Sequence, residues 1–401
     1  MSSKSTRFGV HVDVLKLGLV SLLTDLSSEM IFSVFAIFFT TVAGASAAVL
    51  GLVEGFADFS ASSLDYLAGW LSDRTGRRKV FAVVGYGFST LAKGILLVSS
   101  SVGGLGAFRV IERIGKSFRG PPRDAWLSAV AAHGSRGYSF GVHKALDKSG
   151  AVLGPLVAYG LLSWLGDGAA TYRILFWVAL VPAVLSVLVL ALVKDQPGAK
   201  HARESMVATW RTLSPDFKRY LVTAGIFSLA YFSFGFLLLR AHTVGFAVKD
   251  IVLLYALFNV AFVICAPLIG RLGDRVGRGL IILLGYSTYL LMSLGFAAAT
   301  AKWQVVVLFV VYGVFYSIDE AQSKAFIADI ETERRASAIG MYNFVTGLIY
   351  VPASLGAGAL WLVSPVSTFL AAAGLTAAAM LAFAILRPDV HRASTAIPAR
   401  P

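Results

Sequence analysis

The sequence predicts an all-α integral membrane protein, with twelve transmembrane helices in two pseudo-symmetric six-helix bundles. Hydrophobic residues make up 57% of the chain and charged residues 14%, whereas a soluble domain has about 25% charged residues. Apolar runs of roughly 20 residues, long enough to cross a bilayer, follow one another along the chain. The phrase Gly69–Arg78 returns at Gly270–Gly279, and this offset (270 − 69 = 201) in a chain of 401 residues indicates two homologous halves.

Each half contains six apolar runs that predict membrane-crossing helices. In the first half they cover residues 14–42, 47–71, 79–100, 103–125, 136–164 and 170–194. In the second half they cover residues 216–245, 250–272, 279–301, 304–328, 336–362 and 366–387. We therefore expect an N-terminal bundle at 1–194, a cytoplasmic linker at 195–215, and a C-terminal bundle with a short cytoplasmic tail at 216–401.

Basic residues gather on one side of the predicted spans, and few lie at the opposite turns. The positive-inside rule then places both termini and the linker in the cytoplasm, for a multi-pass protein of the cytoplasmic (inner) membrane. The net charge of +13 would suit nucleic acid, but its confinement to one membrane face argues against that partner. The crowded side includes Arg74, Arg77, Arg78, Arg271, Arg275 and Arg278, and the opposite turns hold Arg173, Arg240, Lys249 and Lys302.

These residues resemble a known family. Gly69–Arg78 resembles the signature loop between spans two and three of the major facilitator superfamily, and the second copy resembles its degenerate repeat. Arg109 and Arg113 are similar to the family's buried arginine motif. Residues 150–155 resemble the fifth-span motif of its proton antiporters, although two later glycines of that motif are replaced here. The resemblance implies a secondary active transporter that works by alternating access, and we expect a monomer in the lipid bilayer.

The repeated phrase also predicts a gate. Asp73 can interact with the positive end of a helix dipole, and the symmetry offers it the start of the eleventh span at Arg335. Asp274 would meet the fifth span at Arg136. Such contacts form only while the cytoplasmic side is closed; the alternative interpretation is a capped, positive-inside turn. The gating candidates are Gly69, Asp73, Arg74, Gly76, Arg77, Arg136, Gly154, Pro155, Asp274, Arg275 and Arg335.

Two acids of the first span predict proton coupling. Asp25 and Glu29 lie one helical turn apart, and a charged side chain at the bilayer centre costs about 2.5–3.5 kcal/mol. Such residues normally face a cavity or a partner. Two carboxylates on one helix face tend to share a proton, which suits a proton-coupling or cation-binding site. The alternative is a structural salt bridge to an arginine of the fourth span.

The fourth span carries a charged stripe with the i, i+3, i+4, i+7 spacing of one helix face. The stripe consists of Arg109, Glu112, Arg113 and Lys116. Because arginine stays charged, it needs a partner, and we expect Asp25 or Glu29 to serve. A pair that opens when the acid is protonated would act as a switch; a static ion-pair network is the alternative.

The fifth span places His143 one turn from Asp147, and an imidazole that titrates near physiological pH can relay protons. The second half has fewer charges, so we expect coupling in the first half and recognition of substrate shape in the second. The proton-coupling candidates are Asp25, Glu29, Asp58, Arg109, Arg113 and His143. The substrate-binding candidates are Glu112, Lys116, Asp147, Asn259, Tyr316, Asp319, Tyr342 and Asn343. Lys93, deep in the third span, also needs a partner.

Several sequence signals are missing. A phosphate-binding P-loop is absent, and so are a G-x-S-x-G nucleophile elbow and a Cys/His metal cluster. We therefore expect no enzyme activity, no cofactor and no metal. The sequence favours a proton-coupled transporter that exports a small organic solute by proton antiport. The alternatives are a proton symporter that imports a polar or anionic metabolite or metal chelate, and a non-transporting membrane sensor.

Overall fold

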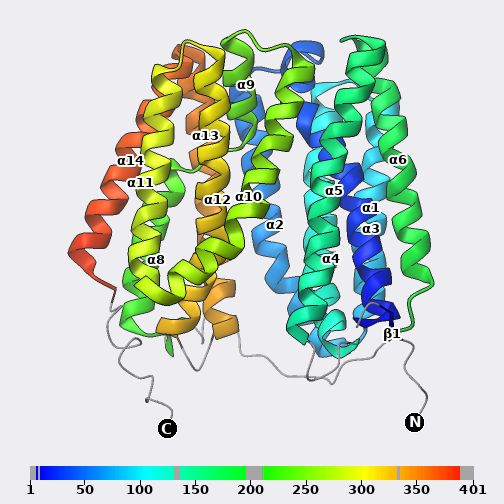
Figure 1. The fold of residues 1–401 in the computed structure, drawn as a ribbon, viewed down its shortest axis with the longest axis horizontal. Helices are drawn as coiled ribbons and strands as arrows, with labels where there is room; N and C mark the ends of the chain where they lie inside the picture. Colours follow the sequence, from blue (N-terminus) through cyan, green and yellow to red (C-terminus); the bar gives the residue numbers. More distant parts are fainter. Residues whose placement is uncertain are drawn as a thin grey trace. The chain divides into compact units, whose positions relative to one another are not determined.

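A computed structural model describes residues 6–7, 10–130, 136–195, 210, 212–331 and 335–388. These residues are helical almost throughout (Figure 1). A short antiparallel pair, β1 (Thr6–Arg7) and β2 (Val10–His11), precedes the first helix. The helices that follow in the first half are α1 (Val12–Ile37) with its π-helical extension η1 (Phe38–Val42), α2 (Ala47–Thr75), α3 (Arg78–Val98), α4 (Val102–Val130), α5 (Arg136–Leu165) and α6 (Ala169–Ala191).

The second half contains α8 (Pro215–Ala230), α9 (Gly235–Thr243), α10 (Val248–Val276), α11 (Arg278–Ala298), α12 (Lys302–Ile330), α13 (Arg335–Val363) and α14 (Pro365–Leu386). The predicted single span at 216–245 is broken between α8 and α9. Tyr231 has an extended backbone, and the Ser233 hydroxyl then accepts a hydrogen bond from the Gly235 amide at 3.2 Å. A local side-chain acceptor of this kind competes with the helical ladder, so the helix restarts there.

Helix bounds repeat between the halves as the sequence predicts. The helices α2 and α10 are both 29 residues long and begin 201 residues apart, at 47 and 248. The helices α4 and α12 are also both 29 residues long and begin at 102 and 302. Each signature turn contains a glycine with positive φ, 70° at Gly76 and 94° at Gly277. Glycine adopts this conformation without steric cost. The same type of turn therefore occurs at the equivalent position of each half.

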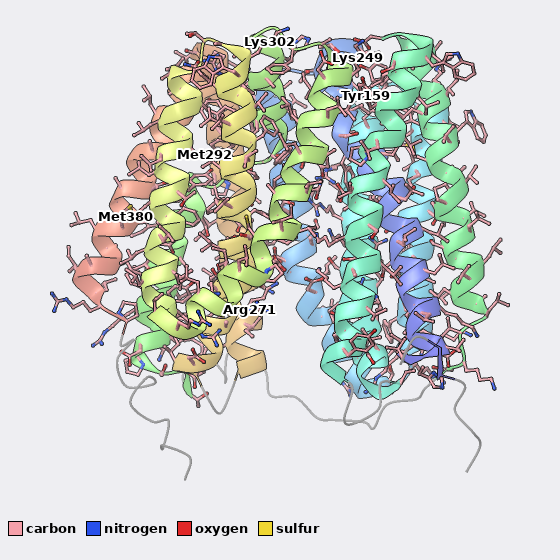
Figure 2. The ribbon with its side chains drawn as sticks, viewed as in Figure 1. Tyr159, Lys249, Arg271, Met292, Lys302 and Met380 are labelled. Atoms are coloured by element: carbon pink, nitrogen blue, oxygen red, sulfur yellow. The ribbon has the colours of Figure 1, made fainter. Side chains whose placement is uncertain are left out.

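Ten helical segments of the described residues are long and apolar enough to cross a membrane. The helices α4 and α5 are as long, 29 and 30 residues, but they are not among these ten segments. Lys302 at the start of α12 and Arg271 near the end of α10 lie at opposite ends of the second half (Figure 2). The twelve-span count stays a prediction.

Two compact units make up the chain. Unit 1 contains Met1–Ala45, Phe56–Arg203 and Ala247–Ala256, and unit 2 contains Ser46–Gly55, Glu204–Phe246 and Leu257–Pro401. The segments 46–55 and 247–256 are equivalent in the repeat, since 247 − 46 = 201, and each clusters with the other half's unit. The division of the sequence at 195–215 stays a prediction, and most of that linker lies outside the described residues.

In unit 1, the helix α1 packs on α5 and α6, and α3 packs on α4. Glycine permits both close approaches. A Cβ on Gly150 would overlap the Leu22 carbonyl oxygen, and one on Gly154 would lie 2.6 Å from the Leu26 carbonyl oxygen. In the other pair, a Cβ on Gly85 would lie 2.6 Å from the carbonyl oxygen of Gly115. Because the backbones of α5 and α1, and of α3 and α4, are in contact, the rotation of α1 and of α4 about its own axis is fixed, and so is the direction of its polar face.

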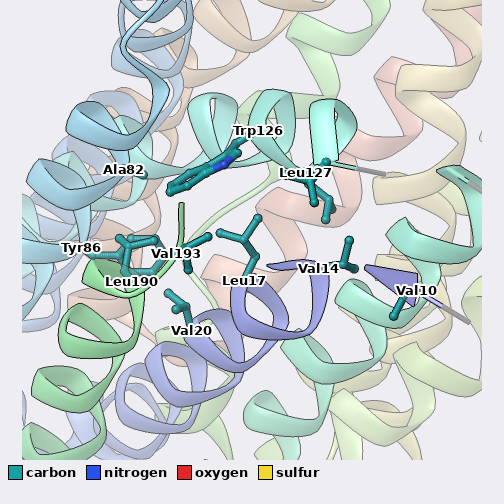
Figure 3. Close-up of a cluster of buried hydrophobic side chains, with 11 residues drawn as sticks. Val10, Val14, Leu17, Val20, Ala82, Tyr86, Trp126, Leu127, Leu190 and Val193 are labelled. Atoms are coloured by element: carbon teal, nitrogen blue, oxygen red, sulfur yellow. The ribbon is translucent and has the colours of Figure 1, made fainter. Parts of the chain in front are cut away.

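An apolar cluster joins the start of α1 to α3, α4 and the end of α6 (Figure 3). Trp126 and Leu17 are fully buried in it. The cluster consists of Val10, Val14, Leu17, Val20, Ala82, Tyr86, Trp126, Leu127, Val130, Leu190 and Val193. In unit 2, α11 packs on α12 and α14, and α8 packs on α13 and α14.

We predict that Gly150→Ala destabilises unit 1. The new methyl group would push α5 away from α1, and overpacking of this kind costs about 1–3 kcal/mol. The matched control is Gly160→Ala on the same helix, where an added Cβ meets nothing within 4 Å; alanine there should be neutral or slightly stabilising. Thermal unfolding of both variants in detergent checks the prediction, which equal melting temperatures would contradict.

Candidate functional site

Charged side chains from α1, α2 and α4 gather inside unit 1. Arg113 of α4 forms a salt bridge with Asp58 of α2, with 3.1 Å between Nη2 and Oδ1. The two side chains are 21% and 25% exposed, so the pair is largely shielded from solvent. The predicted partner of Arg113 was Asp25 or Glu29; the structure pairs it with Asp58 instead. This face of α4 lies against α2, because Ser117, one turn after Arg113, donates a hydrogen bond of 2.8 Å to the carbonyl oxygen of Ala61.

The other half of the stripe is more deeply buried. Glu112 is 0% exposed, and its Oε2 lies 3.7 Å from Nη1 of Arg109. The Arg109 guanidinium also lies over the ring of Phe32, 4.3 Å from its centroid. Within the described part of the chain, neither carboxylate oxygen of Glu112 has a hydrogen-bond partner. Glu112 was predicted to bind substrate, but in this conformation it has no surface to offer a solute.

The two acids of α1 have different surroundings. Glu29 accepts a short hydrogen bond from the hydroxyl of Tyr255, which belongs to the α10 segment of unit 1. Asp25 is half-buried and makes no hydrogen bond or salt bridge with any described residue. It is repelled by Asp147 and Glu29 and attracted by Lys116 and Arg119. Asp25 is therefore the acid of this group whose charge is least compensated.

Lys116 ends the stripe and differs from its neighbours. It is exposed, while Arg109 and Glu112 are buried. No hydrogen bond or salt bridge joins it to another described side chain, and it is attracted by Asp25, Glu112 and Glu29. A solvent-accessible ammonium among carboxylates can either bind an anion or hold the acids in their charged form.

A second polar group lies at the start of α5. The hydroxyl of Ser21 lies 3.0 Å from Nε2 of His143 and accepts a hydrogen bond of 3.2 Å from Arg123. Asp147 lies 4.0 Å from Arg123 and 3.4 Å from Lys144. The structure thus brings His143 and Asp147 into one network through Arg123, a residue that the sequence analysis did not select. Arg113 and Lys116 of α4 form no salt bridge with Asp147, whose charged neighbours here are Arg123 and Lys144.

The candidates of unit 2 lie among aromatic rings. Tyr316 stacks on Tyr312 at a centroid distance of 6.2 Å and meets Phe262 edge-on at 5.3 Å. Tyr342 stacks on Tyr220 at 6.0 Å, and Asp319 accepts a hydrogen bond of 3.2 Å from Ser323. Asn259 is buried and Asn343 half-buried.

The sequence analysis missed the centre of this aromatic group. Tyr231 lies at the break between α8 and α9 and contacts Tyr289 at 5.9 Å and Tyr350 at 5.4 Å. Its hydroxyl lies 3.3 Å from that of Tyr312. The sequence signal that could have revealed Tyr231 is the run of aromatic and polar residues at 231–234. A buried tyrosine usually needs a hydrogen-bond partner for its hydroxyl, so a tyrosine inside an apolar span points to a polar neighbour.

The predicted latch stays a prediction. Gly69 and the side chains of Asp73, Asp274, Arg136 and Arg335 lie outside what the structure describes. Arg74, Arg77 and Arg275 are exposed, and Pro155 is buried. Gly154 sets the close approach of α5 to α1, and its part in gating stays a prediction.

Comparison with known proteins gives a consistent result. A family model described as Major Facilitator Superfamily matches residues 17–297 and 220–401. The chain is similar to an uncharacterised MFS-type transporter of Methanocaldococcus jannaschii, with 34% identity over 365 residues that cover 89% of this chain and 90% of the relative. It is also similar to multidrug resistance protein 1 of Bacillus subtilis, with 25% identity over 290 residues that cover 70% and 72%.

Among solved structures, the nucleoside transporter NupG matches with a TM-score of 0.75 and 14% identity, over 94% of this chain and 99% of that one. This match confirms the predicted all-α membrane fold. At this identity it shows the fold alone.

We predict a coupling energy of about 0.5–3 kcal/mol between Asp58 and Arg113, in a double-mutant cycle of Asp58→Asn and Arg113→Gln. Removing either partner leaves a shielded charge without its salt bridge, whereas removing both does not. The exposed pair of Lys324 and Glu320, at 3.0 Å, is the control and should give at most about 0.5 kcal/mol. Additive losses of thermal stability in the first cycle would contradict the prediction.

Proposed function

The chain belongs to the major facilitator superfamily and is a multi-pass membrane transporter of small molecules, and we propose that it couples the export of a small organic solute to proton entry. The observation that carries the proposal is Asp25, a half-buried acid on α1 that no described residue pairs. In this proposal the chain acts as a monomer in the cytoplasmic membrane, with both termini in the cytoplasm.

Proton antiport follows from competition for two carboxylates. An uncompensated charge inside a membrane protein is unfavourable, so Asp25 is stabilised either by a proton or by a cationic group of the solute. Glu29 lies one turn away and already holds the Tyr255 hydroxyl. A proton bound at this pair releases a cationic solute, and loss of the proton lets the next solute bind. Neither Asp25 nor Glu29 forms a salt bridge with Arg113, because the partner of Arg113 is Asp58. Exchange of a proton for a solute at the two acids therefore does not require a salt bridge to break.

Two observations support export. Multidrug resistance protein 1 is a distant relative by sequence, and residues 150–155 resemble the antiporter motif of the fifth span. The structure gives these residues a physical role, since Gly150 and Gly154 bring α5 onto α1 beside Glu29. Any change in the position of α5 is thus felt at the helix that carries both acids.

Import by proton symport is the second candidate, and one observation favours it. Lys116 is exposed and carries no salt bridge among the described residues, so an anionic metabolite would find a free ammonium there. In that case solute and proton bind together rather than in competition, because the anion contacts Lys116 while the proton occupies Asp25.

The direction of proton flux separates these functions. We predict that in liposomes with an acidic lumen and an internal pH dye, external ethidium drives lumenal alkalinisation, because an entering cation displaces protons. Empty liposomes are the control. Citrate added to liposomes in an acidic medium tests the alternative, since symport predicts acidification of the lumen. Solute movement without any change in lumenal pH would contradict proton coupling.

We further predict that Asp25→Asn with Glu29→Gln lowers solute-dependent proton flux at least about tenfold, because neither amide can bind the transported proton. Solute exchange across the membrane at equal pH should persist. The control is Glu320→Gln, an acid whose side chain is 45% exposed, and it should leave the flux unchanged. Wild-type flux in the double variant would show that other residues carry the proton.

A further inference from the structure

Lys93 of α3 is a buried basic group with no acid against it. Its side chain is 1% exposed. Its Nζ lies 2.7 Å from the hydroxyl of Ser27 and 3.1 Å from that of Ser28, both on α1. No carboxylate of the described residues lies within salt-bridge distance of it.

Hydrogen-bond counting favours the neutral amine at this position. The Ser27 hydroxyl donates to the Ala179 carbonyl oxygen of α6 at 2.5 Å, so toward Lys93 it acts only as an acceptor. An ammonium has three donors and no acceptor; its third N–H and the hydrogen of Ser28 would then lack partners among the described residues. A neutral amine donates to Ser27 and accepts from Ser28 through its lone pair, so both hydroxyls are satisfied and only its second N–H lacks a partner among the described residues.

The described charges that act most strongly on Lys93 belong to side chains that do not contact it. The helix α4 contributes Glu112 and Arg119, of opposite sign, and α1 contributes Asp25 and Glu29. The third neighbour, α6, presents the carbonyl group of Ala179. An ammonium here would be attracted by acids it does not touch, buried away from bulk solvent and with incomplete hydrogen bonding to the described residues. Those attractions strengthen whenever Asp25 and Glu29 lose their protons.

We propose that Lys93 is a second proton-binding site of unit 1, neutral in this conformation, which takes up and releases one proton on its Nζ lone pair. Uptake forms one N–H bond and raises the charge of the unit by one. The lone pair then no longer accepts from Ser28, so the contact between α3 and α1 must rearrange. Ser27 and Ser28 lie between Asp25 and Glu29 on the same helix turn, and the protonation of Lys93 is thereby linked to both acids.

Only the role of Lys93 in coupling rests on the proposed function; proton binding itself is measurable without any solute. The test is NMR of the protein labelled with nitrogen-15 at lysine Nζ, in lipid bilayers, between about pH 5 and about pH 9, the range into which burial can bring a lysine titration. We expect one resonance to convert between the ammonium and the neutral amine within this range. Lys144, which is exposed and lies 3.4 Å from Asp147, serves as an internal ammonium reference.

Two variants identify the resonance. It disappears in Lys93→Met, and if that variant does not fold, Ser27→Ala keeps the lysine and displaces the same signal. An ammonium resonance for Lys93 at every pH would overturn the proposal.

The ethidium assay then assigns the role. Where the wild-type protein shows proton flux, Lys93→Met should lower it at least tenfold and keep ethidium exchange, whereas a purely structural role would lower both. Absence of flux in the wild-type protein would contradict the proposed function and leave the NMR result standing.

Discussion

Each charged side chain inside this protein must be paired, hydrogen-bonded or neutral, and the arrangement of unit 1 follows from that constraint. Burial of an uncompensated charge costs several kcal/mol, more than most single packing contacts contribute. Arg113 meets the constraint with Asp58, and Arg109 meets it with Glu112 and the ring of Phe32. Lys93 meets it with two hydroxyls. Asp25 does not meet the constraint. A proton or a cationic solute would therefore stabilise the protein more by binding at Asp25 than at a charge that is already paired.

Backbone contact holds these groups in register. The helix α5 lies directly on α1 at Gly150 and Gly154, and α3 lies directly on α4 at Gly85 and Gly115. Interfaces without intervening side chains leave little freedom for rotation, since close-packed interiors are not continuously deformable. Serine hydroxyls then connect the helix pairs: Ser27 binds both Lys93 and the Ala179 carbonyl oxygen. A change of protonation at one site is therefore felt by several helices of unit 1.

Much of the fold could be predicted from the sequence, because span length and charge density are properties of single helices. Predicted and observed helix bounds agree within a few residues for most helices, and the 201-residue repeat reappears in the bounds of α2 and α10. The break at Tyr231 was missed because residues 216–245 contain no proline, the residue that most strongly interrupts a helix. Pairings were harder still. Arg113 and Lys116 belong to one stripe, yet Arg113 contacts α2 and Lys116 is exposed. Which of them meets a neighbouring helix depends on the rotation of α4 about its axis, and residue spacing does not predict that rotation.

The repeat itself indicates where proton chemistry is possible. The helices α4 and α12 correspond with an offset of 200 residues, so Arg109, Glu112 and Lys116 correspond to Phe309, Tyr312 and Tyr316. By the 201-residue offset of α2 and α10, Asp58 corresponds to Asn259. Unit 2 thus replaces the charges of unit 1 with aromatic rings, hydroxyls and an amide, which offer shape and hydrogen bonds without a change of charge. Because a cycle driven by protons needs groups that change charge, these positions of the repeat can contribute such groups only in unit 1.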